Sequence, residues 1–257
     1  MDGDLSGVLL ALTGAAGLIV LFDFLVLKKR RAARAAIKTE APAVVRQARG
    51  LFPVLLAVVL FRSFLFEPFR IPSASMMPGL IAGDFIVVSK FTYGLRLPQI
   101  NWKIVSIGEP QRGDVVVFRS PSRSINLIKR LVGLPGDHVV VRENRVTING
   151  VTAPVAVDGA YTGEGEFTGS ALDKEWFGAT AHVIMLAKGR LSVDFDGIVP
   201  PGHYFFMGDN RNDSADSRFA EVGFVSDQLL VGRAVRIWMN WQIPEWPQLT
   251  RIGKRIE

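Results

Sequence analysis

The sequence predicts a mostly β protein preceded by two N-terminal transmembrane helices. Three observations support this prediction: the chain is unusually apolar, two long apolar stretches lie near its N-terminus, and short β-type runs separated by turn residues fill the rest. Of its 257 residues, 49% are hydrophobic, and the mean hydropathy is +0.26. Such a composition is typical of membrane segments added to an ordinary globular domain.

The first expected element is a transmembrane helix within residues 1–27. The stretch Leu5–Leu27 is almost entirely apolar and is long enough to span a bilayer. A cleavable signal peptide is the alternative, but such peptides begin with basic residues and end in a small-residue cleavage site. This chain instead begins with Asp2 and Asp4 and has its basic cluster after the apolar stretch. We therefore expect a retained anchor with its N-terminus outside the cytoplasm.

A basic linker is expected over residues 28–50, followed by a second transmembrane helix over residues 51–66. Eight basic residues and one acidic residue fall in the linker, which therefore carries +7 of charge, whereas the rest of the chain carries −1. Basic residues confined between apolar stretches indicate a cytoplasmic linker rather than a nucleic-acid-binding face. The second stretch contains Pro53 and Arg62, and its length also fits a helix lying in the membrane interface.

From residue 67 onward, β-forming runs alternate with Gly-Asp, Pro-Gly and Asn-Gly turns. This spacing predicts a β core formed by residues 67–141 and 200–257. Residues 142–199 are richer in Gly, Thr and Glu and less periodic, so we expect an inserted smaller β subdomain there. The runs expected to form strands are Phe85–Val88, Val115–Phe118, Ile125–Val132, His138–Val141, Arg145–Ile148, Tyr204–Met207 and Val231–Trp238.

The composition narrows the chemistry that the chain can perform. It contains no cysteine, which excludes disulfides, cysteine nucleophiles and thiolate metal sites. The three histidines, His138, His182 and His203, lie far apart, and none forms a metal-ligand pair at helical spacing. We therefore expect no metal and no cofactor, and any catalysis must depend on hydroxyls, lysines and carboxylates.

A first polar cluster, Ile71–Pro78, follows the second apolar stretch directly. Its two serines, Ser73 and Ser75, lie between two prolines, which fix the flanking backbone and disfavour helix before them. Such a segment can hold a hydroxyl rigidly at a turn, close to a second hydroxyl and to backbone amides. A plain loop leaving the membrane is the alternative interpretation.

A second cluster is the run Ile125–Val132, which contains Lys129 and Arg130. Because side chains alternate along a strand, Lys129 shares a face with apolar residues: Ile125, Leu127 and Leu131. Burial there would lower the lysine pKa from about 10.4 by about two to three units, or roughly 3 to 4 kcal/mol. A neutral amine could then accept the proton of a serine hydroxyl. A charged pair guarding an edge strand is the alternative.

The third cluster, Gly208–Arg218, is dense in Asp, Asn and Ser, which predicts a structured polar loop. In a functional interpretation, Ser214 orients the lysine, while Asp216 and Arg218 brace the loop as a charge-assisted pair. A calcium site is disfavoured because the loop lacks a mid-loop glycine and a terminal Glu. A solvated loop without function remains an alternative.

Taken in order, the three clusters resemble the type I signal peptidases of bacteria, a family of Ser/Lys serine proteases. The resemblance covers residues 65–250 and the layout with two transmembrane helices. It implies a signal-peptidase-like β catalytic domain. The matching motifs are Ser-x-Ser-Met-x-Pro at 73–78, Gly-Asp-Phe at 83–85, Lys-Arg with Gly-Leu-Pro-Gly-Asp at 129–137, and Gly-Asp-Asn-Arg with Ser-x-Asp-Ser-Arg at 208–218. One departure is Gly79, where members of the family usually carry threonine.

The resemblance implies that Ser75 is the nucleophile and Lys129 the general base. Ser73 would complete an oxyanion hole with the Ser75 amide. The implied supporting residues are Ser214, which binds the lysine amine, the pair Asp216 and Arg218, and Asp209 in the same loop. The residues implied to line the substrate pockets are Phe69, Ile71, Pro72, Met76, Leu80 and Ile128.

The implied function is that of a membrane-anchored serine endopeptidase, which removes signal peptides from exported preproteins through an acyl-enzyme. Its expected place is the bacterial cytoplasmic (inner) membrane, with the N-terminus and the catalytic domain on the extracytoplasmic side. The expected partners are signal peptides of preproteins emerging from the export machinery and membrane lipid, with no nucleic acid. Two alternatives are a non-catalytic envelope scaffold and a Ser/His-type hydrolase that uses His203.

Overall fold

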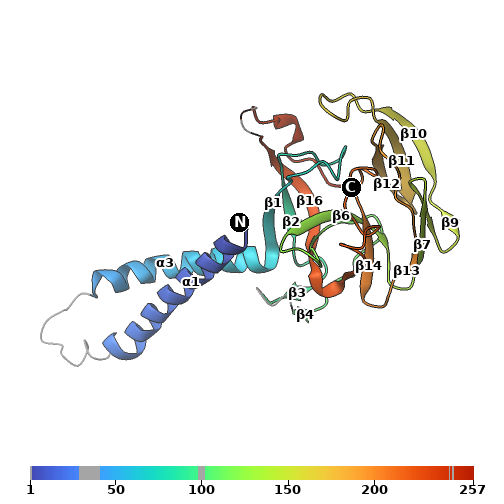
Figure 1. The fold of residues 1–257 in the computed structure, drawn as a ribbon. Helices are drawn as coiled ribbons and strands as arrows, with labels where there is room; N and C mark the ends of the chain where they lie inside the picture. The colour runs from blue at the N-terminus through green and yellow to red at the C-terminus, as the bar shows by residue number, and fades with distance from the viewer. Residues whose placement is uncertain (1, 29–40, 98–101, 243, 245) are drawn as a thin grey trace, which may run out of the picture. The chain divides into compact units, whose positions relative to one another are not determined.

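The computed structural model describes residues 2–28, 41–97, 102–242, 244 and 246–257. The chain forms two compact units, residues 1–65 and residues 66–257 (Figure 1). The first unit is helical, and the second consists almost entirely of β-strands. The mostly β fold predicted from the sequence, with two apolar helices before it, is therefore confirmed.

The helical unit contains two long apolar helices. Helix α1 (Asp2–Phe22) continues into a π-helical turn, η1 (Asp23–Leu27), and α3 (Ala43–Leu60) continues into η2 (Phe61–Leu65). Both helices are long and apolar enough to cross a membrane. Few of their side chains are buried within the protein, which suits lipid better than a protein core.

The second helix begins at Ala43, earlier than the expected start at residue 51. The segment before the apolar stretch joins the helix because it packs against α1, where Val45 and Ala48 are buried. Its Arg49 also forms an ion pair with the fully buried Asp23 of η1. Most of the expected basic linker, residues 29–40, lies outside the described residues.

The β unit is organised around a seven-stranded sheet in which neighbouring strands are antiparallel. In spatial order its strands are β1 (Phe66–Arg70), β2 (Asp84–Ser89), β16 (Leu230–Asn240), β5 (Val115–Arg119), β6 (Asn126–Gly133), β14 (His203–Met207) and β15 (Val225–Ser226). Strand β6 pairs with a neighbour on both sides. The edge-strand interpretation of Lys129 and Arg130 is therefore wrong.

Three smaller sheets complete the unit. One contains β10 (Val155–Ala160), β11 (Ala171–Phe177) and β12 (Thr180–Leu186), and it lies on the opposite side of the unit from β1 (Figure 1). The others are β13 (Phe195–Ile198) with β7 (His138–Arg142), β8 (Arg145–Ile148) and β9 (Val151–Thr152), and the hairpin β3 (Leu95–Arg96) and β4 (Lys103–Val105). Short 3-10 helices lie at η3 (Asp227–Leu229) and η4 (Leu249–Arg251). All seven predicted runs form strands.

Both faces of the central strands are covered by apolar side chains. On β5, Val115 and Val117 belong to one buried cluster, whereas Val116 and Phe118 belong to another on the opposite face. This division follows from the alternation of side chains along a strand. A polar side chain in the middle of β6 is consequently buried whichever face it occupies.

Candidate active site

The side chains of Ser75 and Lys129 meet inside the β unit. Ser75 lies in a turn after β1, and Lys129 lies in the middle of β6. Lys129 Nζ and Ser75 Oγ form a hydrogen bond of 2.6 Å. Only 3% of Lys129 and 7% of Ser75 are exposed. A hydroxyl and an amine are thus held together out of bulk water.

The turn that carries Ser75 is fixed by the backbone on both sides. The Ile71 amide donates to the Asp84 carbonyl at 2.7 Å, and the Gly83 amide donates back to the Ile71 carbonyl at 2.9 Å. Within the turn, the Met77 amide donates to Ala74 O at 3.0 Å. These bonds tie the turn to the start of β2, so the hydroxyl is positioned by the sheet.

The surroundings of Lys129 disfavour its charged form. Burial lowers the pKa of Lys129 to about 8, while the carboxylates of Asp216 and Asp209 oppose a further decrease. The Arg218 guanidinium adds to the lowering. A useful fraction of the amine is therefore neutral near pH 7 to 8, and a neutral amine can accept a proton.

Ser73 lies next to the reactive pair. Its Oγ donates to Ser75 Oγ at 3.4 Å, and its side chain is exposed. The Ser75 carbonyl accepts from the Asn210 amide at 3.1 Å. The Ser73 hydroxyl therefore lies on the solvent side of the site, whereas the backbone of Ser75 is held by Asn210.

The loop Gly208–Arg218 packs against the turn of Ser75. Asp216 and Arg218 form the predicted ion pair through two contacts of 2.8 Å, Nε to Oδ1 and Nη2 to Oδ2. Asp216 also accepts from the Gly208 amide at 2.9 Å. A Cβ on Gly208 would lie 2.5 Å from the Ser75 carbonyl oxygen, so only glycine fits at this approach.

Asp209 has a partner that the sequence analysis did not assign. Arg130 binds it in a bidentate arrangement, with Nε–Oδ1 at 2.8 Å and Nη2–Oδ2 at 2.7 Å, and Arg130 Nη1 donates to Gly113 O at 2.7 Å. Both side chains are buried. Alternation along the strand puts Arg130 on the face opposite Lys129, together with the apolar Ile128 and Val132, and its side chain is buried as well.

Ser214 is placed near the site without the expected hydrogen bond. Its Oγ is buried, lies against Gly208, and forms no hydrogen bond within the described part of the chain. The bond expected from the resemblance, between Ser214 and the amine of Lys129, is therefore not formed in this structure. The amine is instead engaged with Ser75.

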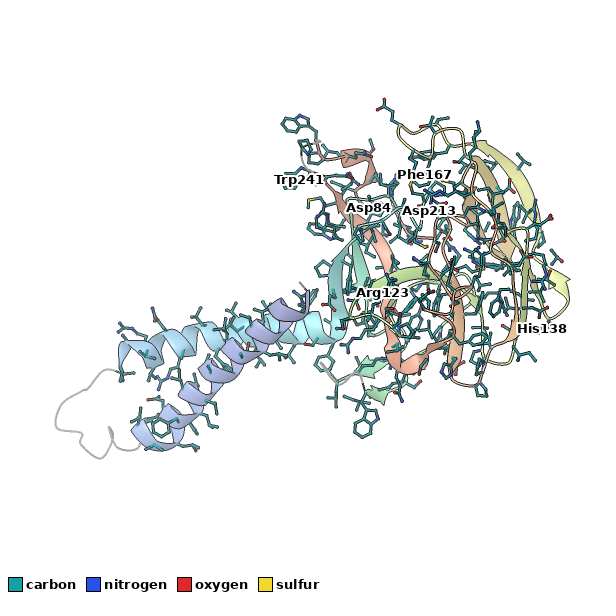
Figure 2. The ribbon with its side chains drawn as sticks, in the orientation of Figure 1. Asp84, Arg123, His138, Phe167, Asp213 and Trp241 are labelled. Carbon is teal, nitrogen blue, oxygen red and sulfur yellow. The ribbon has the colours of Figure 1, made fainter. Side chains whose placement is uncertain are left out.

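Asp84 is a second residue whose role the sequence analysis did not specify, although its Gly-Asp motif drew attention to it. It lies at the start of β2 (Figure 2) and is fully buried. Its carboxylate accepts from Arg251 Nε at 2.7 Å, from Asn240 Nδ2 at 2.9 Å and from the Ile81 amide at 2.9 Å. Asp84 therefore ties the segment after Ser75 to the C-terminal region.

The six residues expected to line substrate pockets divide into two groups. Pro72 is exposed. The other five lie in one buried cluster with residues of β2, β5 and β16: Phe69, Ile71, Met76, Leu80 and Ile128.

The geometry does not support the alternative of a Ser/His-type hydrolase. The ring of His203 lies 3.0 Å from the Pro201 carbonyl, and the hydroxyl of Ser75 binds Lys129.

Comparisons with known proteins show the family to which the chain belongs. Residues 44–239 match the family described as "Signal peptidase, peptidase S26". Signal peptidase I of Pseudomonas aeruginosa is 44% identical over 228 residues, and that of Pseudomonas fluorescens is 46% identical over 228 residues. Each alignment covers 82% of this chain and 79% of the relative. A solved signal peptidase I from Enterococcus faecalis is 30% identical and aligns over 50% of this chain and 98% of that chain. Its TM-score of 0.31 is too low to bear on the fold. The chain belongs to the signal peptidase family, peptidase S26.

Proposed function

We propose that this chain is a membrane-anchored signal peptidase that removes N-terminal signal peptides from preproteins, with Ser75 as nucleophile and Lys129 as general base. The observation that carries the proposal is the buried hydrogen bond of 2.6 Å between Lys129 Nζ and Ser75 Oγ. It is supported by membership of the signal peptidase family. A non-catalytic scaffold would not need a buried amine with a lowered pKa beside a serine.

In the first half-reaction, neutral Lys129 accepts the Ser75 proton as Oγ attacks the scissile carbonyl. The tetrahedral intermediate collapses when the Lys129 ammonium returns this proton to the leaving amine, which releases the mature protein. In the second half, Lys129 takes a proton from water, which attacks the ester of Ser75. Collapse then frees the signal peptide with its new carboxylate and restores the serine hydroxyl.

The negative charge of each intermediate needs donors that face the developing oxyanion. The Ser75 amide and the Ser73 hydroxyl are suited to this role, because Ser73 Oγ already lies 3.4 Å from Ser75 Oγ. The pairs Asp216–Arg218 and Arg130–Asp209 would hold the loop behind the nucleophile. In this proposal the Ser214 hydroxyl, which lies beside Gly208 and makes no hydrogen bond in the described part of the chain, would bind the amine when Lys129 releases Ser75.

The substrate would bind in an extended form beside β1. In the described seven-stranded sheet, β1 is the terminal strand and pairs with β2, so an extended peptide could add to the sheet beside it through main-chain hydrogen bonds. The buried cluster that includes Phe69 and Ile128 would supply shallow apolar pockets for the small residues that signal peptides carry before the cleavage site.

The site would work close to the lipid surface. The second apolar helix ends at Leu65, so the ten residues that follow it to Ser75 can reach at most about 35 Å from its end. A signal peptide held in the same membrane presents its cleavage site within this range. We propose that the membrane is the bacterial cytoplasmic membrane, with the β unit on its outer side and preproteins arriving from the export machinery. Trp238, Trp241 and Trp246 are 43%, 43% and 91% exposed and would meet the lipid interface.

Cleavage of a purified preprotein by the full chain in detergent tests the proposal. The wild type should cut at one bond behind the signal peptide, as mass spectrometry of both products will show. Ser75→Ala and Lys129→Met should each abolish cleavage, whereas the exposed-site controls Ser124→Ala and Lys188→Met should cleave like the wild type. Cleavage that persists in either of the first two variants would overturn the proposal.

A further inference from the structure

The loop Gly208–Arg218, here named the catalytic loop, is attached to the inserted segment 142–199 through a buried arginine. Arg211 follows Asn210 in this loop, and its side chain is almost completely buried. Its guanidinium binds Glu175 of β11 in a bidentate manner, with Nη1–Oε1 at 3.0 Å and a second contact between Nη2 and Oε2. Nη1 also donates to Asn144 O at 3.1 Å. Glu175 and Asn144 both lie in the insert.

The main chain strengthens the same attachment. The Met185 amide of β12 donates to the Asp209 carbonyl at 2.8 Å, and the Arg211 amide donates back to the Met185 carbonyl at 2.9 Å. Met185 and Asn210 thereby form a parallel bridge. A short piece of the catalytic loop thus pairs with β12 at the edge of the three-stranded sheet.

The residue between these contacts reaches the nucleophile. The Asn210 amide donates to the Ser75 carbonyl at 3.1 Å, and Asn210 Nδ2 donates to the Ala74 carbonyl at 3.3 Å. The chain of contacts therefore runs from Glu175 to Arg211, along one peptide to Asn210, and from there to the backbone of Ser75.

At this junction the buried carboxylate of Glu175 and the buried guanidinium of Arg211 neutralise each other through their direct contacts. Burial would raise the pKa of Glu175, but Arg211 and His182 lower it to about 2, so the carboxylate stays ionised. His182 Nε2 lies 3.1 Å from Glu175 Oε2, and burial lowers the pKa of this imidazole, which favours its neutral form. Arg211 thus carries the charge that compensates Glu175, and a buried charge that loses its partner is costly.

We propose that Glu175 of the inserted segment is a positioning residue for the catalytic loop, acting through Arg211 and Asn210 on the backbone of Ser75. This role rests on the proposed function. In this proposal the inserted segment has a definite role. Its three-stranded sheet, which is separate from the seven-stranded sheet, holds the catalytic loop that positions Ser75.

The test compares two substitutions on β11 in the full chain in detergent. Glu175→Asp keeps the negative charge but shortens the side chain, so it cannot hold both guanidinium nitrogens without moving the loop. Asp173→Asn is the matched control, because Asp173 is buried on the same face of β11 but pairs with Arg145, at 3.6 Å, outside the loop. Preprotein cleavage gives kcat and KM, and hydrogen exchange gives the protection of loop 208–218 and of strands β5 and β6.

We expect Glu175→Asp to lower kcat about tenfold or more with little change in KM, because small displacements of reacting groups have effects of this size. Exchange should accelerate in loop 208–218 but not in β5 or β6, and Asp173→Asn should change neither quantity. Arg211→Lys keeps the positive charge but lacks the two guanidinium nitrogens that bind Glu175, so it should reproduce the effect. This second variant keeps the test valid if Glu175→Asp fails to fold.

A wild-type kcat in Glu175→Asp would overturn the proposal, as would exchange that accelerates equally in the loop and in the core strands. A wild type that cleaves no preprotein would contradict the proposed function alone. In that case the exchange experiment still decides whether Glu175 holds the loop.

Discussion

Acid should inactivate this enzyme at a pH set by Lys129. The amine must be neutral to accept the Ser75 proton, and burial lowers its pKa to about 8, against an ordinary value of 10.5. Because the base is lost on protonation, kcat/KM should be highest above the pKa of Lys129 and should fall as the pH decreases through it.

The expected size of the effect follows from the fraction of neutral amine. With a pKa of about 8, about half of Lys129 is neutral at pH 8 and about 1% at pH 6, so kcat/KM should fall about 50-fold between them. A histidine base of pKa about 6.5 would give a decrease of only about fourfold over the same range.

The assay is the initial rate of preprotein cleavage in detergent at low substrate concentration, from pH 5 to pH 10. His203→Ala serves as the control and should give the same curve as the wild type. A curve with its midpoint near 6.5, or activity that is unchanged down to pH 5, would refute a lysine base.

Three further predictions follow from the surroundings of the site. Gly208→Ala should lower kcat about a hundredfold at unchanged expression, since its Cβ would lie 2.2 Å from Ser214 Oγ and 2.5 Å from the Ser75 carbonyl; near wild-type cleavage would contradict this packing. Gly79→Ala should leave cleavage intact and stabilise the fold by about 0.4–1 kcal/mol, because its Cβ would meet only Met76 O at 3.7 Å and Asp209 Oδ2 at 4.0 Å. A lower thermal midpoint would show that glycine is required there. Lys129→Met should raise the thermal midpoint at pH 7 while abolishing activity. Because the pKa of Lys129 is lower in the folded state, the unfolded state binds more protons between pH 8 and 10.5, and the wild type regains stability as the pH rises through this window. The advantage of Lys129→Met should therefore shrink by pH 10.5, and an advantage that does not depend on pH would contradict the lowered pKa.

The strands of the β unit could be predicted because local signals define them. Gly-Asp and Asn-Gly turns mark the ends of the runs, and β-branched residues fill them, so all seven predicted runs form strands. The start of the second helix could not be predicted from apolarity alone. Residues from Ala43 onward are helical because they pack on α1 and because Arg49 pairs with Asp23, both of which are tertiary effects.

The site was predictable only to the extent that its residues lie in recognisable motifs. Alternation along β6 favoured Lys129 only slightly as the buried charge, because both faces of the strand carry apolar residues, and the structure buries Arg130 as well. The partnership of Glu175 with Arg211 joins residues 36 positions apart that share no motif. Only the pairing of β12 with the catalytic loop brings them together.

The most direct measurement is the titration of the Lys129 amine itself. In protein labelled with 13C at lysine Cε, the resonance of Lys129 is the one that disappears in Lys129→Met, and its chemical shift reports protonation. A midpoint near pH 8 is predicted by the burial of this side chain beside Ser75. A midpoint at 10 or above would mean that the amine is fully charged at neutral pH and cannot serve as the base.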